Sequence, residues 1–155
     1  MKAGSGSLNP LLTVMPEGLS VVGDGEWEEV ELAVDSGAAE TVIGEDMVQS
    51  AELRESIASK KGVEYEVANG VRIPNLGEKR FVGTSDEGIS RRLTAQVCDV
   101  NKGLLSVSKI TRGGSRVVFD MDGSYIEDKT THERMNLAER NGMYMLRLWT
   151  QRSGF

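Results

Sequence analysis

Asp35 is the residue of this sequence best placed to do chemistry. It ends an alternating apolar run, residues 30–34, and is followed by Ser36 and Gly37. The alternation predicts a strand that fixes the carboxylate at its end, while Gly37 permits a tight turn against another backbone and Ser36 can hold the loop through its hydroxyl. Two carboxylates that share one proton can activate a water, because like charges so close together cannot both ionise. The pattern therefore predicts water activation by a carboxylate pair, with Asp35 as the catalytic residue.

The composition narrows the other possibilities. The 155 residues are the length of one ordinary domain, and a net charge of −6 argues against a nucleic-acid partner. Cys98 and His132 are single representatives of their types, so neither a zinc site nor a Ser-His-Asp or Cys-His arrangement is expected. A lone cysteine favours a reducing, intracellular location. No apolar run has the length of a membrane span, and we expect no membrane partner, metal or organic cofactor.

The periodicity along the chain is mostly two, which predicts strands. The clearest alternating runs are residues 30–34, 93–98 and 143–148. Helices are predicted over residues 45–57 and 104–111. Turn signals separate these runs at Asn69-Gly70, Gly113-Gly114, Asp122-Gly123 and Asn141-Gly142. Many short strands without alternating helices predict a mainly antiparallel, all-β barrel.

Several blocks of the sequence resemble the retropepsins, and in particular the protease region of copia-type LTR retrotransposons. The blocks are VDSGA at 34–38 with Thr41-Val42, VANG at 67–70, GLLSVSKI at 103–110, VVF at 117–119 and NGMYML at 141–146. The resemblance implies a retropepsin-like acid-protease barrel with one or two short helices and extra C-terminal strands. It divides the chain into a linker or leader at 1–24, a protease core at 25–112 and a β-rich extension at 113–155, which forms a dimer interface or a pre-integrase-like segment.

The resemblance also implies a homodimeric aspartic endopeptidase. One such motif supplies one carboxylate, so Asp35 of each protomer would meet its copy at a two-fold axis, and Ser36 would bond to the partner's loop. The hairpin at Asn69-Gly70 would be a flap that closes over an extended peptide, within a polyprotein of the cytoplasm or a retroelement particle. The residues expected to bind substrate are Ala38, Ala39, Glu40, Val67, Ala68, Asn69, Gly70 and Val71.

Two alternatives stay open beside the protease. Members of the family often carry a second acid two residues after the glycine, where this chain has Ala39. That departure favours a non-catalytic peptide-binding or scaffold module of the same fold. Residues 117–124 also resemble the opening of a HAD-like phosphotransferase, with Asp120 as nucleophile and Asp122 as acid/base. Too little chain follows for that family's later motifs, and a hairpin turn at Asp122 explains the same residues.

Overall fold

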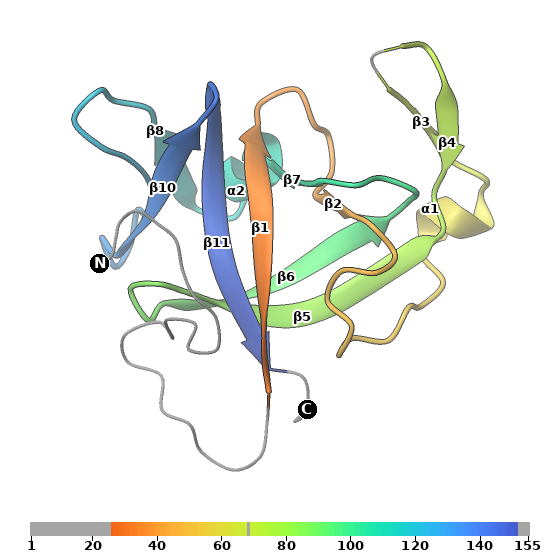
Figure 1. The fold of residues 1–155 in the computed structure, drawn as a ribbon, viewed down its shortest axis with the longest axis horizontal. Coiled ribbons are helices and arrows are strands. Elements are labelled where there is room, and N and C mark those ends of the chain that lie inside the picture. The colour runs from red at the N-terminus through yellow and green to blue at the C-terminus, as the bar shows by residue number, and fades with distance from the viewer. Residues whose placement is uncertain (1–25, 68, 152–155) are drawn as a thin grey trace.

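The computed structural model describes residues 26–67 and 69–151, and this part of the chain is predominantly β (Figure 1). The strands are β1 Trp27–Asp35, β2 Val42–Ile43, β3 Glu64–Glu66, β4 Arg72–Pro74, β5 Gly77–Ser85, β6 Ser90–Val97, β7 Gly103–Ser106, β8 Ser115–Val118, β9 Ser124–Asp128, β10 Arg134–Arg140 and β11 Met143–Gln151. The helices are α1 Ile57–Lys60 and α2 Val107–Arg112. Neither helix of this described part is long and apolar enough to cross a bilayer.

The main sheet returns on itself. Its order is β1-β7-β2-β6-β5-β11-β10-β9-β8, and β11 pairs with β1 as well as with β5 and β10. The first six strands of this order therefore form a closed circuit of pairings, which we call the ring (Figure 1). Most pairings are antiparallel, whereas β1–β7 and β2–β6 are parallel. The prediction of a mainly antiparallel all-β fold is confirmed at the level of fold class.

The core forms where ring strands turn apolar side chains toward one another. Val30 faces Leu148 and Leu32 faces Leu146 across β1 and β11, and each of these four is at most 3% exposed. Complete burial of such a side chain contributes about 1.5–3 kcal/mol. The alternation is not strict, because Ala33 and Met145, on the opposite phase, are also buried at 5% and 6% exposure. Cys98 is buried as well.

The segment predicted as a C-terminal extension is part of the same sheet. Its last strand, β11, pairs with β1 along residues 27–33 and with β5 at Thr84 and Ser85. Of the strands in the main sheet, β8, β9 and β10 lie outside the ring. They form a meander that continues the sheet on one side of β11. Residues 143–151 therefore supply a strand on which the closure of the ring depends.

The helix predicted over residues 45–57 is wrong. This stretch consists of turns and bends, and α1 begins only at Ile57. Its backbone donors are taken by a distant side chain, since Glu28 on β1 accepts the N–H groups of Val48 and Gln49 at 2.8 Å each. Val48 also has a positive φ of 53°, which an α-helix does not allow. A long-range carboxylate replaces the local bonds that a helix would make.

The carbonyls of the same loop are held by a buried lysine. The Lys79 ammonium, on β5, donates to the carbonyl oxygens of Glu45, Met47 and Val48 at 3.2, 2.9 and 3.1 Å. The residue is only 5% exposed. Its three donors are all satisfied by backbone, which is the condition under which a buried ammonium is tolerated.

The second predicted helix begins later than expected. Residues 103–106 form β7, and α2 occupies Val107–Arg112 rather than residues 104–111. The Ser106 hydroxyl accepts the N–H of Lys109 and caps the helix. The preceding leucines are drawn into the strand because β7 lies between β1 and β2.

The predicted turns are confirmed where they connect neighbouring strands. Asn69-Gly70 joins β3 to β4, Asp122-Gly123 joins β8 to β9 and Asn141-Gly142 joins β10 to β11. Asn141 and Gly142 both have positive φ, 53° and 80°, as a two-residue hairpin of this kind requires. Gly114, with φ of 95°, follows the end of α2.

A buried carboxylate, Glu127, organises the meander. Its side chain is 6% exposed and lies 2.7 Å from the Arg116 guanidinium, 3.8 Å from Arg134 and 3.4 Å from His132. The hydrogen bond from Arg116 is the main reason why the pKa of Glu127 lies below its ordinary value. Three neighbours that carry or accept positive charge thus favour the ionised form.

Replacement of Lys79 by methionine should destabilise the protein by about 2–4 kcal/mol, because three carbonyl groups of the loop after β2 lose their buried donor. Urea unfolding followed by tryptophan fluorescence measures the change. Lys129→Met, on an exposed loop, is the control and should leave the free energy of unfolding almost unchanged. A Lys79→Met protein as stable as wild type would show that the ammonium does not hold the 44–56 loop.

Acidification should remove the contribution of Glu127 to stability. Its folded pKa is lowered, so the contribution is present above the unfolded value of 4.5 and is lost as the pH falls through the folded pKa. We expect the difference in unfolding midpoint between wild type and Glu127→Gln to shrink between about pH 7 and about pH 3. The exposed Glu139→Gln is the control. A difference that stays constant over this range would contradict the assignment.

Candidate functional site

Asp35 is the last residue of β1 and therefore lies at one end of the ring. Its Cα is paired with that of Ser106 at the end of β7, which runs parallel to β1. The carboxylate is half-buried. Parallel pairing brings the ends of both strands to one edge of the sheet, so the loop after Asp35 and the start of α2 lie next to each other.

The loop after Asp35 turns back on the carboxylate. The N–H of Gly37 donates to Asp35 Oδ1 at 2.8 Å, and the N–H of Ala38 donates to the Asp35 carbonyl at 3.4 Å. Ser36 is exposed at the tip. One carboxylate oxygen is therefore held by the backbone of its own loop.

Ser106 fixes both ends of this loop, and sequence reasoning gave it no role. It is fully buried; its hydroxyl donates to the Ala38 carbonyl at 2.7 Å, and its N–H donates to Thr41 Oγ1 at 3.1 Å. The same hydroxyl accepts the N–H of Lys109. The only signal in the sequence was its place in the GLLSVSKI block, which does not reveal a partner about 65 residues away.

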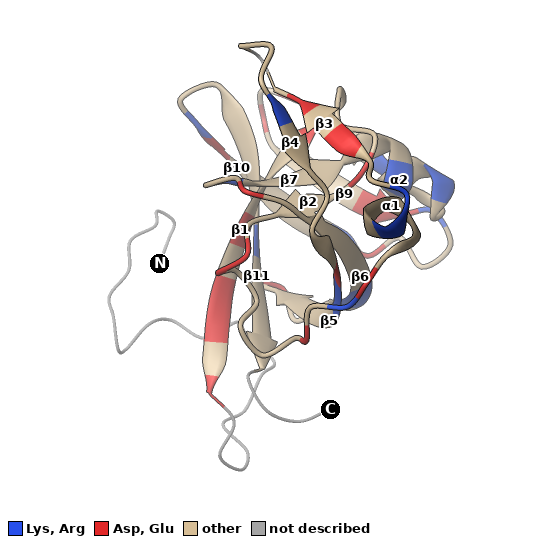
Figure 2. Cartoon of the chain, turned by 90° about the vertical axis from the view of Figure 1, so that its right-hand side faces the viewer, with Lys and Arg blue, Asp and Glu red and all other residues tan. Residues whose placement is uncertain are grey.

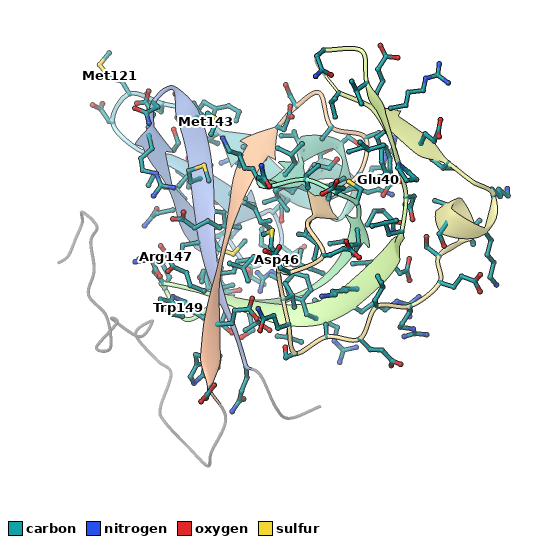
Figure 3. The ribbon with its side chains drawn as sticks, turned by 45° about the vertical axis from the view of Figure 1, so that its right-hand side comes forward. Glu40, Asp46, Met121, Met143, Arg147 and Trp149 are labelled. Atoms are coloured by element: carbon teal, nitrogen blue, oxygen red, sulfur yellow. The ribbon has the colours of Figure 1, made fainter. Side chains whose placement is uncertain are left out.

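The other predicted substrate-binding residues fall into two groups. Ala38, Ala39 and Glu40 follow Asp35 on the same loop; Ala39 is exposed, and Glu40 lies 3.5 Å from the Lys109 ammonium. Figure 3 shows Glu40 between the end of β1 and the β3–β4 hairpin. The second group sits at the tip of that hairpin.

The hairpin of β3 and β4 rises from the same edge of the molecule as the end of β1 (Figure 1). The N–H of Val67 donates to the Val71 carbonyl at 2.9 Å, and Asn69 Oδ1 accepts the N–H of Val71 at 3.0 Å. Gly70, with φ of 85°, completes the turn. Ala68 was predicted to bind substrate and lies outside the described residues. The Asp35 loop and the hairpin thus lie toward the same side of the molecule but are not connected to each other (Figure 1).

Asn75 anchors the base of the hairpin. Its side chain is almost fully buried; the amide donates to the Tyr65 hydroxyl and to Gln96 at 2.9 Å each, and Oδ1 accepts from Ser56 at 3.0 Å and from the Gly77 N–H at 2.8 Å. All four hydrogen bonds available to an amide group are made. These four hydrogen bonds tie the base of the hairpin to its neighbours.

A sizeable cleft of the described residues does not contain Asp35. Its volume is about 950 Å³, and Glu40 and Thr41 are the only residues of the Asp35 loop in its lining. A second, smaller cleft beside Lys102 and Met143 also excludes Asp35. Asp35 therefore lines neither of these two clefts.

The remaining acids give no second centre within the described part of the chain. No group of three or more His, Cys, Asp and Glu side chains gathers there in a way that could hold a metal ion. Asp120 and Asp122 lie in the exposed turn between β8 and β9, where the Ser124 hydroxyl accepts the Asp120 N–H at 3.0 Å. Met121 between them is 97% exposed and points away from the molecule (Figure 3).

Comparison with protein-family models, with curated proteins and with solved structures gave no match for this chain. The functional argument therefore rests on its residues and their geometry.

The bonds of Ser106 predict a measurable cost. Ser106→Ala leaves the half-buried Ala38 carbonyl without its donor and removes the cap of α2. The free energy of unfolding should therefore fall by about 1–3 kcal/mol. Denaturant unfolding measures the loss. Ser108→Ala, in the first turn of the same helix, is the matched control and should change stability much less. Equal effects of both substitutions would contradict the anchoring role of Ser106.

Proposed function

We propose that the protein is an aspartic endopeptidase of the retropepsin kind, active as a symmetric homodimer with Asp35 as the catalytic carboxylate of each protomer. The observation that carries the proposal is the placement of Asp35. It ends a strand of the ring beside the end of β7, its loop is bonded to Ser106 through the Ala38 carbonyl, and it is half-buried. The closed ring of mainly antiparallel strands is compatible with a retropepsin-like barrel.

A second chain would complete the chemistry. Two Asp35 carboxylates that meet at a two-fold axis cannot both ionise, so one holds a proton and the other is charged. The charged carboxylate takes a proton from water as the water attacks the peptide carbonyl, and the neutral one donates a proton to the carbonyl oxygen. In such a dimer the exposed Ser36 would bond to the partner's loop. No step requires a metal or an organic cofactor.

The substrate in this proposal is an extended peptide, such as a segment of a polyprotein. It would lie between the Asp35 loop, with Ala38, Ala39 and Glu40, and the hairpin tip around Asn69. The hairpin would act as a flap, because the described residues of its tip bond to one another while its base is fixed by Asn75. Closure would exclude water and position the scissile bond.

A peptide-binding module without catalysis is the second candidate. Two observations favour it: Ala39 offers no carboxylate to the substrate backbone, and the cleft of about 950 Å³ is not lined by Asp35. The two candidates differ in one respect, since only the enzyme needs the proton-sharing chemistry of Asp35.

Cleavage of an unstructured protein should depend on Asp35 and on protein concentration. We expect wild type to cut between about pH 4 and about pH 7, where a proton-sharing pair can operate, with a specific activity that rises with concentration. Asp35→Asn keeps the shape of the side chain, cannot share a proton in the same way, and should be inactive. The measurement is the appearance of fragments by mass spectrometry over a dilution series.

Asp122→Asn is the matched control for this experiment. It makes the same chemical change at an exposed turn and should leave cleavage unchanged; it also removes the acid/base of the phosphotransferase alternative. Equal activity of wild type and Asp35→Asn would refute the proposed role of Asp35. Absence of cleavage in both, together with dimerisation, would favour the binding module.

A further inference from the structure

The cleft of about 950 Å³ lies between β6 and α1 on one side and α2 with the β8–β9 hairpin on the other. Its volume is at the upper end of the range of about 300–1,000 Å³ for ligand clefts. Its floor is apolar and includes Leu93, Leu105, Ile126 and Leu148. A long apolar floor suits a chain molecule better than a compact ion.

The rim of this cleft is basic in an acidic protein. Its cationic side chains are Lys60, Lys61, Arg80, Arg91, Arg92 and Lys109, and its acidic ones are Glu40, Glu55, Glu78 and Asp128. Six cations and four acids give the rim a formal charge of +2, whereas the whole chain carries −6. Figure 2 shows Lys and Arg residues on α1, α2 and β6, and Asp and Glu residues along β1 and on β3. The rim of the cleft thus differs in sign from the chain as a whole.

Two of the rim cations are free to meet a ligand. Lys61 and Arg92 are exposed, and neither makes an ion pair with another described residue. Arg91 instead pairs with Asp128 at 3.4 Å and with Glu133 at 3.1 Å. Charge of one sign without an internal partner is complementary to a negatively charged segment.

The edge of β6 that borders the cleft is open. β5 pairs with one edge along the whole of β6, but β2 pairs with the other edge only at Gln96 and Val97. The N–H of Gln96 donates to the Thr41 carbonyl on the β2 side. Because the direction of backbone groups alternates along a strand, Arg92 and Thr94 direct their N–H and C=O groups to this same open side.

We propose that the cleft binds an extended acidic peptide segment, which adds a strand to the open edge of β6 at Arg92 and Thr94. The backbone of the segment would continue the line of β2, its apolar side chains would enter the floor, and its carboxylates would meet Arg92 and Lys61. This is strand addition to an exposed sheet edge. The four carboxylates of the same rim disfavour a nucleic acid, whose every phosphate is negative.

The site is separate from Asp35 but continuous with its loop, since Glu40 and Thr41 line one end of the cleft. Under the proposed function, the bound segment would be a part of the substrate polypeptide remote from the cleaved bond. Binding itself does not depend on that function. Experiments with the Asp35→Asn protein therefore test the cleft even if the protein proves to be no protease.

The probe is a fluorescein-labelled, blocked octapeptide of alternating glutamate and valine, titrated with Asp35→Asn protein and followed by anisotropy. We expect saturable binding that weakens with added salt and is at least about tenfold weaker for the same peptide with lysine in place of glutamate. Two further peptides carry N-methyl groups on alternate residues in opposite phases. Only the phase that faces β6 should abolish binding, because it removes the donors of the added strand.

Three substitutions in the Asp35→Asn background locate the site. Arg92→Glu should weaken binding about tenfold, and Thr94→Pro should abolish it, because proline removes the open-edge N–H and is tolerated at a strand edge. Lys129→Glu changes the net charge equally, lies outside the cleft and should have no effect. Circular dichroism checks that each variant is folded. If Thr94→Pro does not fold, Arg92→Glu and the methylated peptides still test whether the peptide binds at the edge of β6.

Several results would overturn the proposal: no binding of the acidic peptide, equal binding of the lysine peptide, equal effects of Arg92→Glu and Lys129→Glu, or insensitivity to both phases of methylation. Tighter binding of a labelled oligouridylate, lost on Arg92→Glu, would assign the cleft to nucleic acid instead.

Discussion

The parallel pairing of β1 with β7 is the contact on which the candidate site depends. It places Ser106 beside Asp35, and the buried serine then bonds to Ala38, to Thr41 and to the first turn of α2. One residue thereby sets the shape of the Asp35 loop, the start of β2 and the start of a helix. Because a buried hydroxyl without partners is costly, these elements are stable in this arrangement as a set rather than singly.

Polar anchors of the same kind occur wherever the chain leaves the ring. Lys79 and Glu28 satisfy the backbone of the loop after β2, and Asn75 satisfies the base of the hairpin. Short strands alone cannot bury enough apolar surface to order such long connections. Buried side chains with fully used hydrogen-bonding capacity order them instead, which leaves the hairpin tip and the Asp35 edge free for function.

Local patterns predicted what depends on neighbours in sequence. The alternation at residues 30–34 and the Asn141-Gly142 turn identified a strand and a hairpin because period and backbone conformation are local properties. The helix over residues 45–57 was wrong because Glu28 and Lys79, distant in sequence, take its backbone groups. Ring closure by β11 and the bonds of Ser106 are equally non-local. The sequence located Asp35 and the hairpin, whereas the basic cleft required the fold.

Gly37 connects the local geometry to the question of a second chain. Its φ is not positive, and a Cβ there would meet Asp35 Oδ1 at 3.4 Å, an ordinary contact. Neither conformation nor packing within the chain therefore demands glycine at this position. Gly103 is different, because a Cβ there would lie 2.5 Å from Leu32. In the proposed dimer, the partner's Asp35 loop would approach the backbone of Gly37 closely, which would explain why this position is a glycine. The same two-fold contact would bring the second Asp35 carboxylate to the site.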